Sequence, residues 1–188
     1  MKRLASWLLA GSAAALAQPA AAPLQPLPTL EIAPYMGTWY QVLWIPNRFQ
    51  KQCVADTVAT YRELADGTVE VINRCRQADR SIDSVRGIAR APAGVARIEG
   101  GKLMPARLEV SFLPAWLRWT GIGWGAYWVV ELAADGRYAI VSEASREYLW
   151  VLSRQSALTP MDESVIRTRL QVLGFDLAQV QVHRHGMR

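Results

Sequence analysis

Gly37-Thr38-Trp39-Tyr40 begins an apolar run that ends near Ile45. A glycine directly before a tryptophan lets the backbone approach a neighbouring strand while the large ring turns inward. Far along the chain, residues 148–154 have the composition of a last strand, and they end in Arg154, which could cover that ring. The two stretches together predict the floor of a β-barrel.

Eight strand-like segments, rich in Val, Ile, Tyr and Trp, are separated by turn residues from residue 38 onward. Two connections, residues 65–67 and 133–136, are hairpin turns in which glycine accepts a positive φ. No long helical crossover separates the strands, so we expect an all-β, up-and-down antiparallel barrel whose interior can hold one small ligand. The expected strands are residues 38–45, 54–64, 68–76, 82–90, 104–112, 126–132, 137–141 and 147–153.

One helix is expected after the last strand. Thr159 resembles an N-cap with Pro160 at the first helical position, and Asp162 and Glu163 suit the first turn. Apolar residues then recur at helical spacing, so the helix should pack one face on the outside of the barrel. These residues are Val165, Ile166, Leu170 and Leu173.

The beginning of the chain has the pattern of an export signal. Lys2 and Arg3 precede an apolar run, and Ala15-Leu16-Ala17 resembles a cleavage site. Leu9-Ala10-Gly11 is the lead-in of a bacterial lipoprotein signal, but Ser12 follows where a cysteine would receive the lipid. We therefore expect a soluble periplasmic or secreted protein. The expected divisions are a signal peptide at 1–17, a proline-rich arm at 18–34 that is mobile or lies on the surface, one domain at 35–182 and a tail at 183–188.

Charge and cysteine content narrow the possible functions. Cleavage would remove Lys2 and Arg3 and no acid, which lowers the formal charge from +5 to +3. The remaining basic residues are scattered, so nucleic-acid binding has little support. Cys53 and Cys75 are the two cysteines of the chain, and in an exported protein such a pair most often forms one disulfide; free thiols are the alternative.

Six stretches, in this order and spacing, resemble the lipocalins, and within them the bacterial lipocalin and apolipoprotein D-like branch. They cover roughly residues 32–180. The resemblance implies an eight-stranded calyx that is closed at one end by Trp39 and Arg154 and open at the other, with Gly37 also in a structural role. It also implies binding of a small hydrophobic molecule such as a fatty acid or lysophospholipid. The stretches are residues 35–40, 46–49, 59–74, 108–112, 127–129 and 148–154.

The pocket can be drafted from the alternation of inward and outward residues along each strand. If Tyr61 lies opposite Asn73, the charged Arg62, Glu70 and Arg74 all face outward. The resemblance points to the same inner face, although these side chains could instead simply fill the barrel. The ligand-lining residues that it implies are Tyr61, Asn73, Phe112, Trp128 and Trp150.

A tryptophan-rich segment at residues 113–126 should join two strands at the open end. Trp116, Trp119 and Trp124 lie there beside Arg118, and amphipathic rings beside a cation favour a membrane interface. We expect either a lid or membrane-touching lip through which lipid enters, or an ordinary hydrophobic plug.

Other chemistries find less support. His183 and His185 form an H-x-H pair with no third ligand nearby, so we expect no metal site and no cofactor. No G-x-S-x-G motif is present, which argues against a serine hydrolase. The chain is expected to be a monomeric binding protein. Two alternatives stay open: a lipocalin-fold isomerase or de-epoxidase that uses a cysteine, and an envelope-interaction protein without a ligand.

Overall fold

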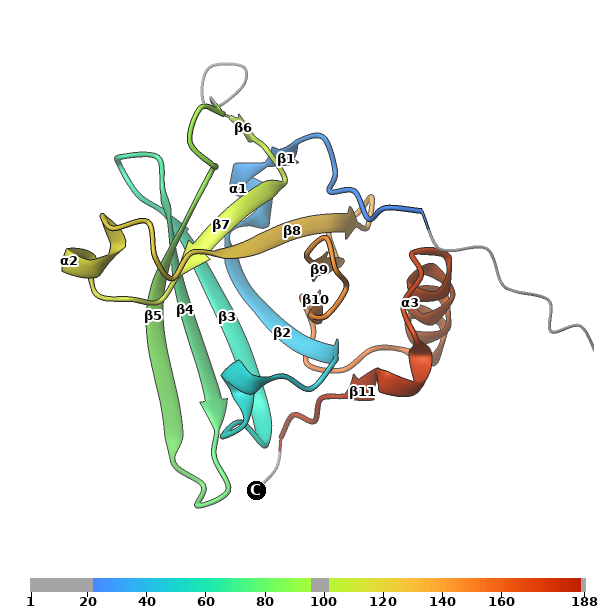
Figure 1. Cartoon of the computed structure of the whole chain (residues 1–188). Helices are drawn as coiled ribbons and strands as arrows, with labels where there is room; N and C mark the ends of the chain where they lie inside the picture. The colour runs from blue at the N-terminus through green and yellow to red at the C-terminus, as the bar shows by residue number, and fades with distance from the viewer. Residues whose placement is uncertain (1–21, 96–101, 187–188) are drawn as a thin grey trace, which may run out of the picture.

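The computed structural model describes residues 22–95 and 102–186, and its main body is a closed antiparallel barrel (Figure 1). Eight strands form the wall in chain order, and the circle closes where β10 pairs with β2. The predicted fold class is confirmed. The barrel strands are β2 (Gly37–Trp44), β3 (Ala55–Glu63), β4 (Val69–Arg76), β5 (Ile82–Arg90), β7 (Arg107–Ser111), β8 (Gly125–Leu132), β9 (Tyr138–Ser142) and β10 (Leu149–Ser153).

Short elements complete the described chain. The expected strand at residues 104–112 is interrupted at Pro105, which has no N–H to donate to a ladder; its first residue instead belongs to a strand paired outside the barrel. The predicted signal segment lies outside the described residues. The short elements are β1 (Leu30–Glu31), α1 (Ile32–Tyr35), η1 (Arg48–Gln50), β6 (Leu103–Met104), α2 (Ala115–Arg118), η2 (Leu177–Gln179) and β11 (Gln181–Val182).

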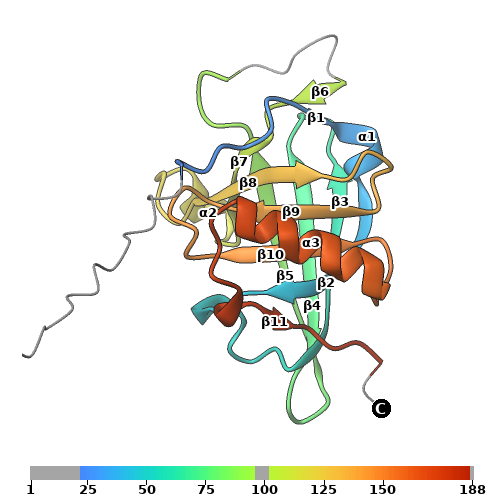
Figure 2. The ribbon, with the colours of Figure 1, turned by 90° about the vertical axis from the view of Figure 1, so that its right-hand side faces the viewer.

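The helix α3 (Pro160–Val172) lies across β9 and β10 on the outside of the barrel (Figure 2). Its N-terminus is capped as predicted, because the Thr159 side chain accepts a hydrogen bond from Asp162 N. Ile166 and Leu170 are fully buried against outward-facing residues of β9 and β10. Val165, which the sequence pattern placed on the same apolar face, is 40% exposed.

The direction of each strand shows which turns and loops lie at which end of the barrel. The tight turns at residues 64–68 and 133–137 lie at the end where β2 begins, and Trp39 lies there too. The loops at residues 45–54, 77–81, 112–124 and 143–148 lie at the opposite, open end. A separate apolar cluster fills the barrel interior and includes Trp39, Tyr61, Val71 and Leu152.

The described part of the proline-rich arm packs against the barrel. Leu24, Leu30 and Ile32 are buried, and Leu27 N donates a backbone hydrogen bond to Val129 O at 2.9 Å. Leu30 also pairs with Met104 in the small sheet formed by β1 and β6. These contacts place residues from 22 onward on the barrel surface, while residues 18–21 lie outside the described part.

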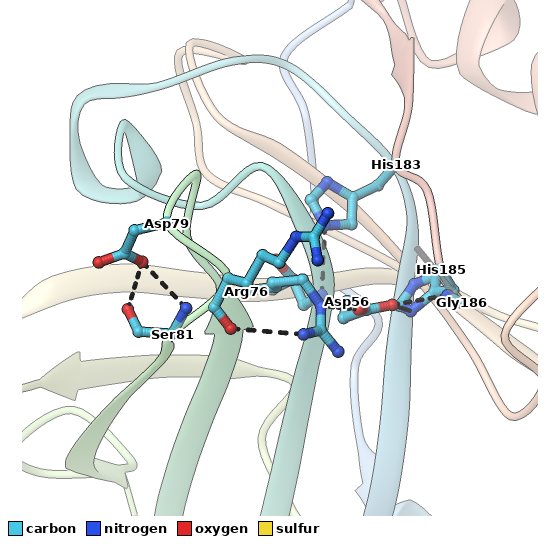
Figure 3. A network of polar contacts seen from close by, with 9 residues as sticks. Asp56, Arg76, Asp79, Ser81, His183, His185 and Gly186 are labelled. Carbon is cyan, nitrogen blue, oxygen red and sulfur yellow. Dashed lines mark hydrogen bonds and ion pairs between the residues drawn. The ribbon is translucent and has the colours of Figure 1, made fainter. Parts of the chain in front are cut away.

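The C-terminal segment lies beside β2 and β3 where these strands separate (Figure 3). His183 N donates to Val42 O, and Asp56 N donates to Arg184 O, both at 2.9 Å. Asp56 adopts a positive φ of 55° at a bulge in β3, and its carboxylate accepts from Arg76 Nε at 2.6 Å and from Gly186 N at 2.7 Å. Residues 183–186, expected as a tail, therefore bridge two barrel strands.

None of the helices in the described parts of the chain is both long and apolar enough to cross a membrane.

Candidate ligand-binding site

The floor of the barrel is sealed by Trp39 and Arg154. The guanidinium carbon of Arg154 lies 3.7 Å from the centre of the Trp39 ring, and Trp39 Nε1 donates to Tyr35 O at 2.8 Å. Arg154 also donates to the carbonyls of Thr38, Met36 and Pro34. One cation thus covers a buried ring and satisfies three carbonyls, which is the contact expected from the sequence.

Gly37 enters this floor with a φ of 89°, a conformation that side-chain-bearing residues rarely adopt. A Cβ atom here would lie 3.7 Å from Arg154 Nη1, which is ordinary contact. The backbone conformation, more than the space, therefore favours glycine at this position.

Three tyrosine hydroxyls meet above the floor. Tyr127 Oη lies 2.8 Å from Tyr35 Oη and 2.9 Å from Tyr61 Oη. Burial raises the pKa of Tyr61 to about 12 and the pKa values of Tyr35 and Tyr127 well above the usual value. All three hydroxyls therefore stay protonated at neutral pH, and they share two hydrogen bonds between them. This tyrosine cluster can offer an O–H group to a ligand that reaches the base of the calyx.

Inward-facing side chains of the barrel wall become more exposed to solvent toward the open end. Val85 on β5 is 42% exposed, and Phe112, one residue beyond the end of β7, is 37% exposed, although both occupy inward-facing positions. Phe112 lies directly on Gly87, where a Cβ would come within 2.6 Å of its Cδ1 atom. Because Gly87 has no side chain, the aromatic ring can lie flat against β5. The wall is thus closely packed at the floor and accessible at the mouth.

Four of the five expected lining residues point into the barrel, and one does not. Tyr61 and Trp150 contact the interior apolar cluster, and Asn73 and Phe112 occupy inward positions closer to the mouth. Trp128 packs instead with the outer cluster beneath α3, and the guanidinium carbon of Arg107 lies 5.0 Å from its ring centre. Its neighbour Tyr127 faces inward in its place.

The expected register between β3 and β4 is wrong by two residues. Tyr61 pairs with Val71, and Asn73 pairs with Ala59. An even shift leaves every side chain on its predicted face, because inward and outward positions alternate with period two. Arg62 and Glu70 accordingly face outward, where Arg62 Nη2 lies 2.8 Å from Glu70 Oε2.

A polar cluster near the mouth was not found by sequence reasoning. Gln50, from the loop that contains η1, places its carboxamide between Gln41 on β2 and Trp150 on β10. These glutamines belong to no recognisable sequence motif. The signal that could have revealed them is Gln41 itself, a polar residue at an inward-facing position of a mainly apolar strand. Thr57, the next inward-facing residue on β3 after Ala59, is also buried.

The tryptophan-rich loop divides into exposed and packed rings. Trp116 is 69% exposed and Trp119 is 83% exposed. Trp124 is half-buried: the guanidinium carbon of Arg90 lies 3.7 Å from its ring centre, and Trp124 Nε1 donates to Arg118 O at 3.2 Å. Further exposed large apolar side chains at the open end are Phe49, Val54, Ile82 and Ile122.

The predicted disulfide is confirmed. Cys53, in the loop before β3, is bonded to Cys75 near the end of β4, with their Cα atoms 5.4 Å apart. Cys53 lies outside the ladder and bends back, since its N–H donates to Gln50 O. The bond occupies both cysteines of the chain and ties the mouth loop to the barrel wall.

The two histidines are engaged in packing. His183 Nε2 accepts a hydrogen bond from Thr57 N at 3.2 Å, and His185 Nε2 lies 2.8 Å from Gln41 O. Burial and the neighbouring His185 lower the pKa of His183 to about 4. Across residues 22–95 and 102–186, no group of three or more His, Cys, Asp or Glu side chains is arranged to hold a metal ion.

Comparisons with known proteins agree with this geometry. Residues 30–185 match a family described as a lipocalin-like domain. The chain is 30% identical to temperature-induced lipocalin-1 of Arabidopsis thaliana, over 80% of this chain and 77% of that protein. It is also 30% identical to the outer membrane lipoprotein Blc of Escherichia coli strain K12, over 77% of this chain and 73% of that protein.

Solved structures show the same fold at lower identity. The cockroach allergen Per a 4 superposes with a TM-score of 0.62 at 15% identity, covering 88% of this chain and 96% of that chain. Apocrustacyanin C1 superposes with a TM-score of 0.60 at 14% identity, covering 82% of this chain and 79% of that chain.

Proposed function

The chain belongs to the lipocalin-like family, whose members generally bind small hydrophobic molecules, and from this we propose that it carries or stores a fatty acid, a lysophospholipid or a related lipid in the bacterial cell envelope. The ligand would lie in the calyx with its chain toward the tyrosine cluster and its head group near the mouth. Burial of the acyl chain supplies the affinity, at about 25 cal/mol per Å2.

The observation that carries this proposal is the gradient along the inner wall. Side chains at the floor are buried in contact with one another, whereas Val85, Phe112 and the half-buried Asn73 and Trp150 face inward and keep accessible surface. Apolar surface that faces inward and remains accessible is what a hydrophobic ligand can cover.

The proposed location rests on the cysteines and on a relative. Disulfides persist in oxidising compartments, and Cys53 is bonded to Cys75. The Escherichia coli relative is described as an outer membrane lipoprotein. We infer from these two observations that the protein works as a monomer in the cell envelope.

The exposed rim residues support transient contact with a lipid surface. Trp116, Trp119 and Ile122 project from one loop at the open end, beside Arg118. Tryptophan favours the depth of lipid head groups, and a nearby cation favours anionic lipids. This lip would position the mouth where a lipid can enter.

Ligand binding is tested by filling the calyx. Asn73→Trp places a large ring on the half-buried inner face of β4, whereas Arg74→Trp makes the same change at the next residue, which is exposed on the outer face. In titrations that follow displacement of a fluorescent fatty acid, Asn73→Trp should abolish uptake and Arg74→Trp should leave it unchanged. Equal uptake by both variants, or no saturable uptake by the wild-type protein, would contradict the proposal.

Membrane contact has its own test. Trp116→Ser combined with Trp119→Ser should reduce binding to vesicles that contain anionic phosphatidylglycerol, measured by co-sedimentation. Met161→Ser removes an equally exposed apolar side chain from α3, outside the mouth, and should have no effect. If wild-type protein fails to sediment with these vesicles, the proposed membrane contact of this loop is wrong.

We infer binding and not catalysis. The enzyme alternative depends on a cysteine nucleophile, and the Cys53–Cys75 disulfide leaves neither thiol free. Thiol titration in denaturant, before and after reduction, checks this point, since two reactive thiols before reduction would revive the alternative.

A further inference from the structure

The polar cluster at the mouth has a side chain from a loop as its central member. Trp150 Nε1 donates to Gln50 Oε1 at 2.7 Å, and Asn47 Nδ2 donates to the same oxygen at 3.3 Å. Gln50 Nε2 in turn donates to Gln41 Oε1 at 2.9 Å. The carboxamide of Gln50 is therefore held against the inner wall on both sides, although it comes from the half-exposed loop that contains η1.

Two buried polar atoms in this part of the wall have no partner of their own, one of them on Gln41, which contacts the Gln50 carboxamide. Gln41 is 2% exposed and Thr57 is 5% exposed, and neither Gln41 Nε2 nor Thr57 Oγ1 has a hydrogen-bond partner in the described parts of the chain. Both residues lie one position beyond the last pair of the β2–β3 ladder, Tyr40 with Val58, and occupy the next inward-facing sites.

A buried amide or hydroxyl that is left unpaired has lost its hydrogen bonds to water without gaining others, which destabilises the folded protein. Folded proteins retain such groups where something else completes the hydrogen bonds, either a ligand or a bound water. Gln41 lies opposite Leu152, a member of the interior cluster, so its side chain is directed into the calyx. Thr57 has the same inward parity on β3, so both unpaired groups belong to residues of the inner wall.

The surroundings favour an uncharged ligand group. Two cations on β4 flank Thr57. Arg74 is exposed on the outer face of the wall, and Arg76 is already paired with the Asp56 carboxylate at 2.6 Å. His183, which contacts Thr57 N, is neutral at pH 7 because burial keeps its pKa near 4. A carboxylate placed here would lose its hydration without gaining a counter-charge. A carbonyl oxygen could instead accept hydrogen bonds from an indole, an amide and a hydroxyl.

We propose that Trp150, Gln41 and Thr57 form a receptor for the uncharged carbonyl of an acyl ester or acyl amide, and that the Gln50 carboxamide occupies this receptor until the ligand displaces it. Gln50 is itself an amide, so its carbonyl already takes the position of the ligand's carbonyl against Trp150 Nε1. The inference rests on the proposed function and adds the chemistry of the head group. It predicts that the protein binds ester lipids more tightly than free fatty acids.

The test compares three probes of similar chain length: monoolein, oleate and a straight-chain alkene, each titrated against a displaceable fluorescent apolar probe. Wild-type protein should bind monoolein most tightly. Thr57→Val removes one hydroxyl with little change of shape, and should weaken monoolein about three- to tenfold, the loss of one hydrogen bond, while alkene affinity stays unchanged. Gln50→Ala removes the internal competitor and should strengthen monoolein binding by a similar factor.

Two control variants make the same types of substitution at sites outside the proposed receptor. Thr60→Val is the same substitution at an outward-facing site of the same strand, and Gln52→Ala alters the same loop at a side chain that bonds to Asp83. Neither should change any of the three affinities. A shift in these controls as large as that in Thr57→Val or Gln50→Ala would overturn the proposal.

Other outcomes separate this proposal from the proposed function. Binding of all three probes with no preference for monoolein, and with Thr57→Val and Gln50→Ala like wild type, would overturn the head-group receptor and leave the calyx function intact. A crystal of the monoolein complex with an ordered water on Gln41 and Thr57, and the ester elsewhere, would also overturn it. Failure of every probe to bind would contradict the proposed function itself.

Discussion

Trp39 and Arg154 close the floor of the barrel through contacts with each other and with the nearby backbone. The ring is fully buried, and the guanidinium is occupied by the ring and by three carbonyl oxygens. No donor of this pair is directed toward the mouth in the contacts of the described residues. We therefore assign the floor to stability and the residues above it to binding.

Trp39→Ala should lower the free energy of unfolding by about 4 kcal/mol, because a large buried side chain is replaced by a cavity. Trp119→Ala, at an 83% exposed site, should change it by less than about 0.5 kcal/mol. Urea unfolding followed by circular dichroism measures both. A Trp39→Ala protein of unchanged stability that no longer binds lipid would contradict this division of roles.

Individual residues also show where sequence reasoning ends. Alternation along β3 predicted that Tyr61 faces inward, and the family resemblance predicted the same of Trp150; both contact the interior cluster. The orientation of Trp128 could not be predicted, because β8 contains an irregularity between Val129 and Glu131 and because both Tyr127 and Trp128 are aromatic. Hydrophobicity does not distinguish two adjacent aromatic residues, so only the pairing with β7 and β9 decides which of them faces inward.

Among the elements, the barrel strands were the most predictable and the connections the least. The strand predicted at residues 82–90 has the observed bounds of β5, since alternation and flanking turns define it. The Asp56 bulge and the C-terminal segment beside β2 and β3 were not predicted. Both depend on contacts between residues more than 100 positions apart, which local patterns do not record.

Among the connections between elements, the disulfide is the one whose contribution to stability can be measured most simply. Cys53 and Cys75 are 22 positions apart, and closing a loop of this length reduces the entropy of the unfolded chain by an amount worth about 3 kcal/mol. Replacing both cysteines by serine should lower the free energy of unfolding by about that amount. The same loss should appear in wild-type protein unfolded in the presence of reductant, and equal stability with and without the bond would refute the estimate.

The C-terminal segment predicts a pH dependence. The pKa of His183 is lowered from 6.5 to about 4 in the folded state, by burial and by His185, so the folded protein binds fewer protons than the unfolded chain between these values. Stability contributed by neutral His183 is complete above pH 6.5 and is lost as the pH falls toward 4, by about 1.4 kcal/mol per pH unit.

His183→Gln tests this dependence, because a glutamine oxygen can accept the hydrogen bond from Thr57 N but carries no titrating group. Between pH 7 and pH 5, wild-type protein should lose up to about 2 kcal/mol more than the variant in urea unfolding. Equal losses in the two proteins would show that His183 is not the group responsible.

At the scale of the whole molecule, the barrel runs from a sealed floor to an accessible, aromatic mouth. The floor contains Trp39 and the tyrosine cluster, the mouth contains the Gln50 carboxamide, and the rim presents Trp116 and Trp119. The fold and the floor could be predicted from the first and last strands. The polar cluster at the mouth could not, because its members come from a loop and two strands and share no sequence motif.

The central claim is that this barrel holds a lipid, and native mass spectrometry of protein purified from its natural source without detergent tests it most directly. We predict a second mass that exceeds the polypeptide mass by one lipid, that dissociates on collisional activation, and that is absent from Asn73→Trp prepared in the same way. A polypeptide mass alone, together with no saturable lipid uptake by the same sample in titration, would contradict the account.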